Sequence, residues 1–294
     1  MFQQLLVNGL IAGSVYALIA LGFTVIYKTV RFFHIAHGVV YAAGAYLAYS
    51  VINSWHSAAG WVVGVLVSLV GAGLLGLLID RSVYLPLRKK KSPNLVFLIA
   101  SFGVFILIQN LIQIIWGAQI VTLRTGPVEI GHQFFGAVIT TNQIIIILTA
   151  VILSLALWYL FQRTKMGKAI RAVADDPIGA SIVGIYPERI ILYAFAIGSV
   201  LAGIAGILIS LETNLDPTMG FSAILNGIIA SIVGGIGSLP GALLGGLFIG
   251  LAENFGIWFL PTQWKDTIGF VILIIFLLLK PSGILGEKTE KNRV

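Results

Sequence analysis

Long stretches without a charged residue are the feature of this sequence that most restricts its fold. Residues 221–251 contain no Lys, Arg, Asp or Glu, and other uncharged intervals recur along the chain. A membrane-spanning helix needs roughly 20 apolar residues, and these intervals provide them. Hydrophobic residues make up 58% of the 294 and charged residues 10%, with a mean hydropathy of +1.01, whereas soluble domains carry about 25% charged residues. The sequence therefore predicts an integral membrane protein.

The uncharged intervals predict an all-α polytopic bundle. A glycine-rich segment at 222–258 contributes either two full spans or a re-entrant hairpin, turning at Gly234 to Pro240, so we expect about eight to nine transmembrane helices. The other helices are expected near 5–27, 36–53, 61–79, 94–117, 142–161, 190–211 and 267–280.

The chain is expected to be one domain. No stretch is polar enough to form a soluble domain, so residues 1–294 are predicted to form a single transmembrane domain. The opening residues 1–4 carry no basic residue, and we therefore expect residues 5–27 to be a retained first helix rather than a cleaved signal.

The positions of Lys and Arg predict the orientation in the membrane, because basic residues are retained in cytoplasmic loops. All of the 18 basic residues except Arg124 and Lys265 follow the first, third, fifth or last expected helix. The amino terminus is therefore expected outside, and residues 281–294 are expected to form a cytoplasmic tail. The net charge of +7 is then explained by topology rather than by a nucleic-acid partner.

The glycine-rich stretch GGIGSLPGALLGG, residues 234–246, does not match known nucleotide-binding loops. Pro240 stands where a dinucleotide fingerprint needs glycine, and the one Gly-Lys pair, Gly167-Lys168, is followed by Ala169 instead of Ser or Thr. Glycines four residues apart allow close helix packing. A turn at this place can also line a substrate path, and the sequence leaves both interpretations open.

The longest cytoplasmic segment is expected at residues 162–190. Lys165 to Ala174 favours a basic helix, and Asp176-Pro177 supplies an N-cap followed by proline at the first helical position. The short helix that begins there is expected to end near Gly184. It is either a connector that packs on its own membrane domain or a docking element for a soluble partner.

Polar residues inside the expected spans are either interhelical contacts or substrate contacts, because burying a polar group without a partner is costly. They are Asn110, Gln113, Asn226, Glu253 and Asn254. His34 and His37 are three residues apart, but a metal site needs three or four ligands, and the chain contains no cysteine. We expect no metal site and no enzymatic centre, since the spans lack a convergent set of acids, bases or ligands.

Four segments carry a resemblance to a known family. They are LLVNGLIAGSVYALIALGFTVIY at 5–27, HIAHGVVYAAGAY at 34–46, TKMGKAIRAVADDPIGASIVGI at 164–185 and GGIGSLPGALLGGLFIGLAE at 234–253. In this order they resemble the permease subunits of branched-chain amino-acid ABC importers, specifically the shorter of the two paired permeases. The resemblance covers nearly the full length.

The resemblance implies a multi-pass permease of a bacterial or archaeal plasma (inner) membrane, forming the translocation pathway for branched-chain or other neutral amino acids. It implies two ATP-binding subunits, a second related permease and a periplasmic or extracellular substrate-binding protein. The chain itself would need no cofactor, because its partners bind ATP. Members of the family that import urea or short amides leave the substrate open, and a homodimer or a heterodimer of permeases remains possible on sequence grounds. A stand-alone channel or facilitator is a further alternative, although it does not explain residues 162–190.

The resemblance points to a coupling region, and the roles of single residues are our inference from their chemistry. Residues 164–185 match the region that engages the ATPase subunits, with Pro177, Ala180 and Gly184 expected to set the start, the close partner contact and the end of the short helix. The full set expected for ATPase coupling is Arg171, Asp175, Asp176, Pro177, Ala180 and Gly184. The set expected to line the translocation pathway is His37, Asn110, Gln113, Asn226, Gly237, Pro240, Glu253 and Asn254.

Overall fold

The computed structural model describes residues 1–124, 131–134 and 136–286. Its first half contains α1 (Phe2–Val30), α2 (His37–Ser54), α3 (Ala58–Ile79), a π-helical turn (Asp80–Tyr84), α4 (Leu85–Lys89), α5 (Asn94–Trp116), β1 (His132–Phe134) and β2 (Ala137–Ile139). Its second half contains α6 (Thr141–Arg163), α7 (Lys165–Asp175), α8 (Pro177–Ile182), α9 (Pro187–Glu212), α10 (Met219–Gly234), α11 (Leu239–Gly256), a 3-10 turn (Thr262–Trp264) and α12 (Lys265–Leu279).

The predicted helices are present, with ends that differ by a few residues. The glycine-rich segment forms two helices, α10 and α11, separated by a turn at residues 235–238, close to the predicted turn. Two features were not predicted: the π-helical turn after α3, and a short antiparallel hairpin in which His132 of β1 pairs with Ile139 of β2. The last eight residues of the expected cytoplasmic tail, 287–294, lie outside the described residues.

The structure supports a polytopic all-α membrane protein. Seven helical segments of the described chain are long and apolar enough to cross a membrane, and α10, with 16 residues, is a shorter apolar helix. Helix α2 is not among the seven, so the count of eight to nine spans stays a prediction. The seven are Phe2–Val30, Ala58–Lys89, Asn94–Trp116, Thr141–Arg163, Pro187–Glu212, Leu239–Gly256 and Thr262–Leu279.

The chain folds into two compact units that are discontinuous in sequence. Unit 1 comprises Met1–Thr24, Glu129–Ser154 and Leu225–Val294, and unit 2 comprises Val25–Val128 and Leu155–Ile224. Helices α1, α6 and α10 contribute residues to both units.

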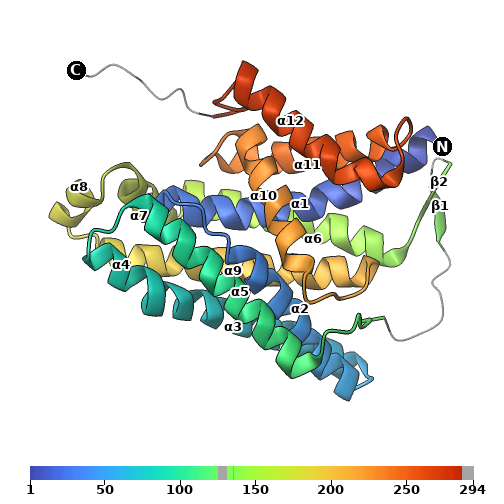
Figure 1. The fold of residues 1–294 in the computed structure, drawn as a ribbon, viewed down its shortest axis with the longest axis horizontal. Coiled ribbons are helices and arrows are strands. Elements are labelled where there is room, and N and C mark those ends of the chain that lie inside the picture. The colour runs from blue at the N-terminus through green and yellow to red at the C-terminus, as the bar shows by residue number, and fades with distance from the viewer. Residues whose placement is uncertain (125–130, 135, 287–294) are drawn as a thin grey trace. The chain divides into compact units, whose positions relative to one another are not determined.

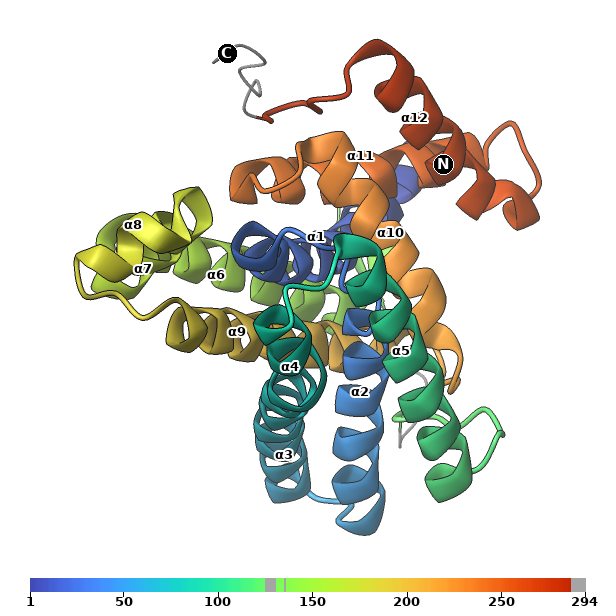
Figure 2. The ribbon, with the colours of Figure 1, turned by 60° about the vertical axis from the view of Figure 1, so that its left-hand side comes forward.

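Unit 2 is built around α2 and α9. Helix α2 lies between α3 and α5, and α9 packs against α2 and α3 (Figure 2). A Cβ atom added to Gly44 of α2 would lie 2.6 Å from the Cα of Gly203 in α9. Small residues therefore let these helices approach closely, which is how packing is gained between helices in lipid.

Unit 1 uses glycine in the same way. Helix α11 packs against α12 (Figure 1) and also against α1. A Cβ atom added to Gly13 of α1 would lie 2.8 Å from the Cα of Leu247, and one added to Gly250 of α11 would overlap the backbone of Gly13. On its other side, Gly245 of α11 meets the carbonyl of Ala230 in α10. The close-packing interpretation of these glycines is supported.

Candidate functional site

The segment α7–α8 of unit 2 is the first candidate site. Helix α7 begins with Thr164 as N-cap, whose hydroxyl oxygen accepts a hydrogen bond from the Gly167 N–H at 3.1 Å. Its buried face carries Gly167, Ile170 and Val173, while Lys165 and Lys168 on the other face are exposed. Because its charged side chains lie on one face only, α7 lies against the unit with its apolar face inward.

Helix α8 begins as the sequence predicted. The Asp176 carboxylate accepts a hydrogen bond from the Ile178 N–H at 2.9 Å, and Pro177 occupies the first helical position. At the other end, Gly184 has a φ of +85°, and the N–H groups of Gly184 and Ile185 bond to the carbonyls of Ser181 and Ala180 at 3.1 and 3.0 Å. This is the Schellman arrangement that closes a helix. The predicted start and end of α8 are confirmed.

The exposed face of α8 is apolar. Ile178, Ile182 and Val183 are 75%, 80% and 74% exposed. Ala180, by contrast, is only 4% exposed, and α8 packs against α7 and α9. The small side chain of Ala180 therefore packs within this chain, and Ile178, Ile182 and Val183 form the exposed face. The contact of Ala180 with a partner stays a prediction.

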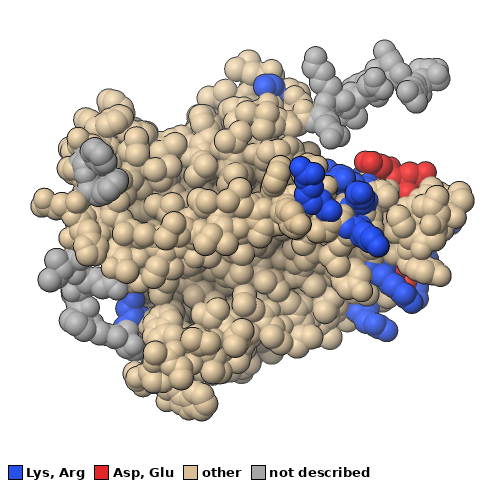
Figure 3. Space-filling model, turned by 180° about the vertical axis from the view of Figure 1, so that it is seen from behind, with Lys and Arg blue, Asp and Glu red and all other residues tan. Residues whose placement is uncertain are grey.

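Charged side chains surround this segment. In Figure 3, Lys and Arg side chains gather at the end of unit 2 that carries α4, α7 and α8, with acidic side chains beside them. Asp175 and Asp176 are exposed. Arg171 has a different role, because its guanidinium donates a hydrogen bond to the carbonyl of Phe161 in the last turns of α6. Arg171 thus holds α7 to the preceding helix.

The turn between α10 and α11 in unit 1 is the second candidate site. Gly235 and Gly237 have φ angles of +116° and +84°, which only glycine adopts without strain. Ser238 is the N-cap of α11, accepting a hydrogen bond from the Gly241 N–H at 3.2 Å, and Pro240 lies in the first helical turn, where it is exposed.

The chain after α12 crosses this turn. The N–H groups of Ile284 and Leu285 donate to the carbonyls of Val233 and Gly234 at 2.8 Å each. These carbonyls lie at the end of α10, where no intrahelical donor is available. Residues 281–286 therefore complete the hydrogen bonds of α10, and this contact was not predicted because it joins segments far apart in sequence.

Three of the predicted pathway residues are buried in unit 1, namely Asn226, Glu253 and Asn254. The Glu253 carboxylate accepts a hydrogen bond from the Tyr16 hydroxyl at 2.9 Å, and its other oxygen has no partner among the described residues. The Asn254 amide donates to the Gly250 carbonyl at 2.8 Å. Glu253 is therefore a buried polar group tied to α1.

The other pathway candidates belong to other parts of the fold. Gly237 and Pro240 belong to the α10–α11 turn, whereas His37, Asn110 and Gln113 are in unit 2. His37 is fully buried, while Asn110 is exposed and its amide donates to the carbonyl of Ile106 within the same helix. The structure does not bring the eight predicted pathway residues into one cluster within either unit.

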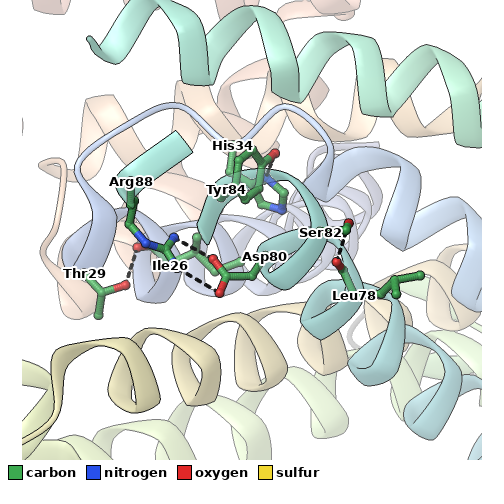
Figure 4. A network of polar contacts seen from close by, with 8 residues as sticks. All are labelled: Ile26, Thr29, His34, Leu78, Asp80, Ser82, Tyr84 and Arg88. Carbon is green, nitrogen blue, oxygen red and sulfur yellow. Dashed lines mark hydrogen bonds and ion pairs between the residues drawn. The ribbon is translucent and has the colours of Figure 1, made fainter. Parts of the chain in front are cut away.

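A polar network in unit 2 was missed (Figure 4). The Arg88 guanidinium donates to both carboxylate oxygens of Asp80, at 2.6 and 3.0 Å, and Asp80 is fully buried. In the same π-helical turn, the Tyr84 hydroxyl lies 2.9 Å from the Nδ1 of His34. The sequence contains a pattern that could have indicated this ion pair. Asp80 directly follows the uncharged interval 61–79, and Arg88, a basic residue, lies eight residues later.

Among the described residues, His34 and His37 are not joined by further ligands into a metal site. Their rings are 6.0 Å apart, and across the described parts of the chain no three His, Cys, Asp or Glu side chains gather as a metal site requires.

Comparisons with known proteins cover almost the whole chain. Residues 5–277 match the family described as branched-chain amino acid transport system / permease component. The high-affinity branched-chain amino acid transport system permease protein LivH of Escherichia coli K12 is 37% identical in an alignment of 297 positions that covers 97% of this chain and 96% of that protein.

Two further relatives agree. The corresponding permease protein BraD of Pseudomonas aeruginosa is 36% identical over 97% of this chain and 96% of its own length. A probable branched-chain amino acid transport permease protein LivH of the archaeon Methanocaldococcus jannaschii is 27% identical over 98% of this chain and 94% of its own length. These are transport permeases and not enzymes, and the predicted resemblance is confirmed: the chain belongs to the family of branched-chain amino acid transport system permease components.

Proposed function

We propose that this chain is a membrane permease subunit of an ABC importer, forming the pathway for branched-chain or other neutral amino acids. The observation that carries the proposal is α8, a short helix with a defined start and end that exposes Ile178, Ile182 and Val183 beside basic side chains. An exposed apolar face rimmed by charge is a usual feature of a protein contact. The names of the relatives support the substrate class.

The partners follow from this proposal. The assembly would contain two ATP-binding subunits, with α8 as the docking helix of this chain. A second related permease would complete the pathway, and a periplasmic or extracellular substrate-binding protein would deliver the ligand. ATP would be bound by the partners, because the sequence contains neither of the two nucleotide-loop patterns. Urea or a short amide is the alternative substrate.

We propose that 1–294 acts as one permease domain in the inner membrane, with the amino terminus outside and α7–α8 and the tail in the cytoplasm. The asymmetry of Lys and Arg supports this orientation. We also propose two full crossings for α10 and α11, giving nine spans with α2. Residues 284 and 285, which follow the end of α12 by a few residues, donate hydrogen bonds to the end of α10. This contact supports a position of the α10–α11 turn at the same membrane depth as the end of α12.

The pathway residues are proposed from the sequence as His37, Asn110, Gln113, Asn226, Gly237, Pro240, Glu253 and Asn254. Of these, Glu253 has the strongest support, because an ionisable group within a span is costly and is retained mostly for function.

The docking face is tested by Ile182→Asp, which places a charge on the exposed face of α8. We expect the variant to insert and fold normally but to lose co-purification with its ATPase subunits and to lose uptake of labelled leucine. Phe259→Ser, at a residue that is 86% exposed and predicted on the outer side, is the matched control and should retain both.

Uptake of leucine, glutamine and urea by the unmodified assembly identifies the substrate class. Full ATPase binding and full uptake by Ile182→Asp would show that α7–α8 is only a connector. Uptake by the purified chain without ATPase subunits would favour a stand-alone facilitator.

A further inference from the structure

The side chain of Arg31 links the end of α1 to the end of α7. Its guanidinium donates a hydrogen bond of 2.6 Å to the carbonyl of Ala174, 143 residues further along the chain. Ala174 lies in the last turn of α7, where carbonyls have no intrahelical donor and where a cation meets the negative end of the helix dipole. Arg31 therefore caps α7 just before Asp176, the residue that begins α8.

The backbone at Arg31 has an uncommon conformation. Its φ is +53°, a left-handed value that is disfavoured for a residue with a Cβ atom. Its N–H donates to the carbonyl of Tyr27 at 2.8 Å, so the residue both ends α1 and turns the chain. Such conformations persist where the surrounding contacts hold them in place.

The loop after Arg31 is anchored in the helices of unit 2. The Phe32 ring stacks on Phe97 of α5 at 4.8 Å and meets the edge of Tyr84 at 4.9 Å. The His34 ring bonds to the Tyr84 hydroxyl, and the Ala36 N–H donates to the Ser101 hydroxyl of α5 at 2.9 Å. Residues 31–36 thus form a short bridge between the α7–α8 junction and two other parts of unit 2, the π-helical turn and α5.

We propose that Arg31 is a positioning residue that connects docking at α8 to the transmembrane helices of unit 2. The inference rests on the proposed function of α8. It adds the contacts through which a movement of α8 would reach the transmembrane helices of unit 2. A partner that displaces α8 pulls on the carboxyl end of α7, and the hydrogen bond from Arg31 transmits that displacement to the 31–36 bridge. Without the guanidinium, α8 still offers its apolar face, but its motion is no longer tied to the bridge.

Lys28 provides a matched control. It lies one turn before Arg31 in α1 and carries the same charge, but its ammonium makes no hydrogen bond or ion pair with the described residues. A general effect of positive charge at this end of α1 would appear equally in variants of either residue. An effect of the Ala174 contact would appear only at Arg31.

The test uses the full chain assembled with its ATPase subunits, second permease and binding protein in liposomes, comparing Arg31→Ala, Arg31→Lys and Lys28→Ala. Three quantities are measured: the amount of ATPase subunit that co-purifies, the rate of ATP hydrolysis, and leucine transported per ATP hydrolysed. We expect Arg31→Ala to retain its ATPase subunits while leucine transported per ATP falls about tenfold, the scale expected for losing a hydrogen bond to a charged group. Arg31→Lys should recover part of this ratio, and Lys28→Ala should match the unmodified chain.

The proposal is overturned if Arg31→Ala keeps the normal transport-to-ATP ratio, or if Lys28→Ala lowers that ratio equally. It is also overturned if Arg31→Ala misfolds, so that ATPase binding and transport are lost together, and if Arg31→Lys misfolds as well. Arg31 would then be only a structural residue. Failure of the proposed function looks different, since in that case the unmodified chain itself does not bind ATPase subunits. Hydrogen exchange in the isolated chain supplies a partner-free measurement, in which the amides of α8 should exchange faster in Arg31→Ala than in Lys28→Ala.

Discussion

The carboxylate of Asp80 is held by the guanidinium of Arg88 through two hydrogen bonds of 2.6 and 3.0 Å. Asp80 is fully buried at the start of the π-helical turn, and Arg88 follows in α4. The paired geometry suits the fork of a guanidinium, which a lysine cannot reproduce. The pair therefore fixes the direction in which the chain leaves α3, next to the Tyr84 and His34 contact.

Removing Arg88 should destabilise unit 2. Arg88→Ala leaves a buried carboxylate without its partner, so we expect the free energy of unfolding to fall by about 3 to 5 kcal/mol. Thermal unfolding in detergent measures the change. Arg81→Ala, at an exposed residue beside Asp80, is the control and should stay within about 0.5 kcal/mol of the original chain. Equal stability of the two variants would mean that the ion pair does not hold the turn.

The sequence predicted the features that depend on residues close together in the chain, and it did not predict those that depend on contacts between distant segments. The limits of α8 were predictable because Asp176, Pro177 and Gly184 act on backbone groups within a few residues. The burial of Ala180 was not, since it depends on where α7 and α9 lie. Likewise, Glu253 was identified as costly to bury, but its partner Tyr16 is 237 residues away in sequence, and no spacing rule connects them.

The glycine turn illustrates the same limit. The sequence predicted a turn between α10 and α11, but it could not distinguish the glycines that contact another helix from those that do not. Gly241 and Gly245 contact α10, whereas a Cβ added to Gly237 would meet no atom within 4 Å. The contact of residues 281–286 with the turn joins the ends of two helices, and composition carries no signal for it.

Substitutions at three glycines should separate steric overlap from backbone strain. Alanine at position 235 would have to adopt a φ of +116°, and its Cβ atom would overlap the backbone of Gly286. We therefore expect Gly235→Ala to abolish the contact of residues 281–286 with the turn and to lower the free energy of unfolding by more than about 3 kcal/mol. Gly237→Ala has the strain without the overlap and should cost about 1 to 2 kcal/mol. Unfolding curves and proteolysis after residue 280 measure both effects.

Gly103 is the control for these variants. It lies within α5 with open space around it, so Gly103→Ala should be neutral or stabilise the helix by about 0.5 to 1 kcal/mol. Similar losses at Gly235 and Gly237 would contradict the close approach of the backbone to the turn.

Stability should depend on pH through His34. Burial, and secondarily the nearby His37, lower the pKa of His34 well below its ordinary value. The unfolded chain takes up a proton at His34 near pH 6.5, while the folded chain does not, so the free energy of unfolding should fall as the pH drops below about 6.5 and should be flat with respect to this group above it. The melting temperature in detergent, measured between about pH 5 and about pH 8, on either side of the ordinary histidine pKa, checks this dependence.

The control for the pH experiment is His56, which is exposed. His34→Gln should reduce the pH dependence, whereas His56→Gln should leave it unchanged. If both variants follow the original curve, another group is responsible for the loss of stability in acid.

The orientation of the chain in the membrane can be tested directly, because the sequence contains no cysteine. Lys90 and His56 are both exposed, and the distribution of basic residues predicts that Lys90 lies in the cytoplasm and His56 outside. In intact cells, a membrane-impermeant maleimide should therefore label His56→Cys and leave Lys90→Cys unlabelled. After the membrane is permeabilised, both positions should react, which controls for accessibility. Labelling of Lys90→Cys alone in intact cells would reverse the topology and would place α8 on the side of the membrane where no ATP is available to its proposed partners.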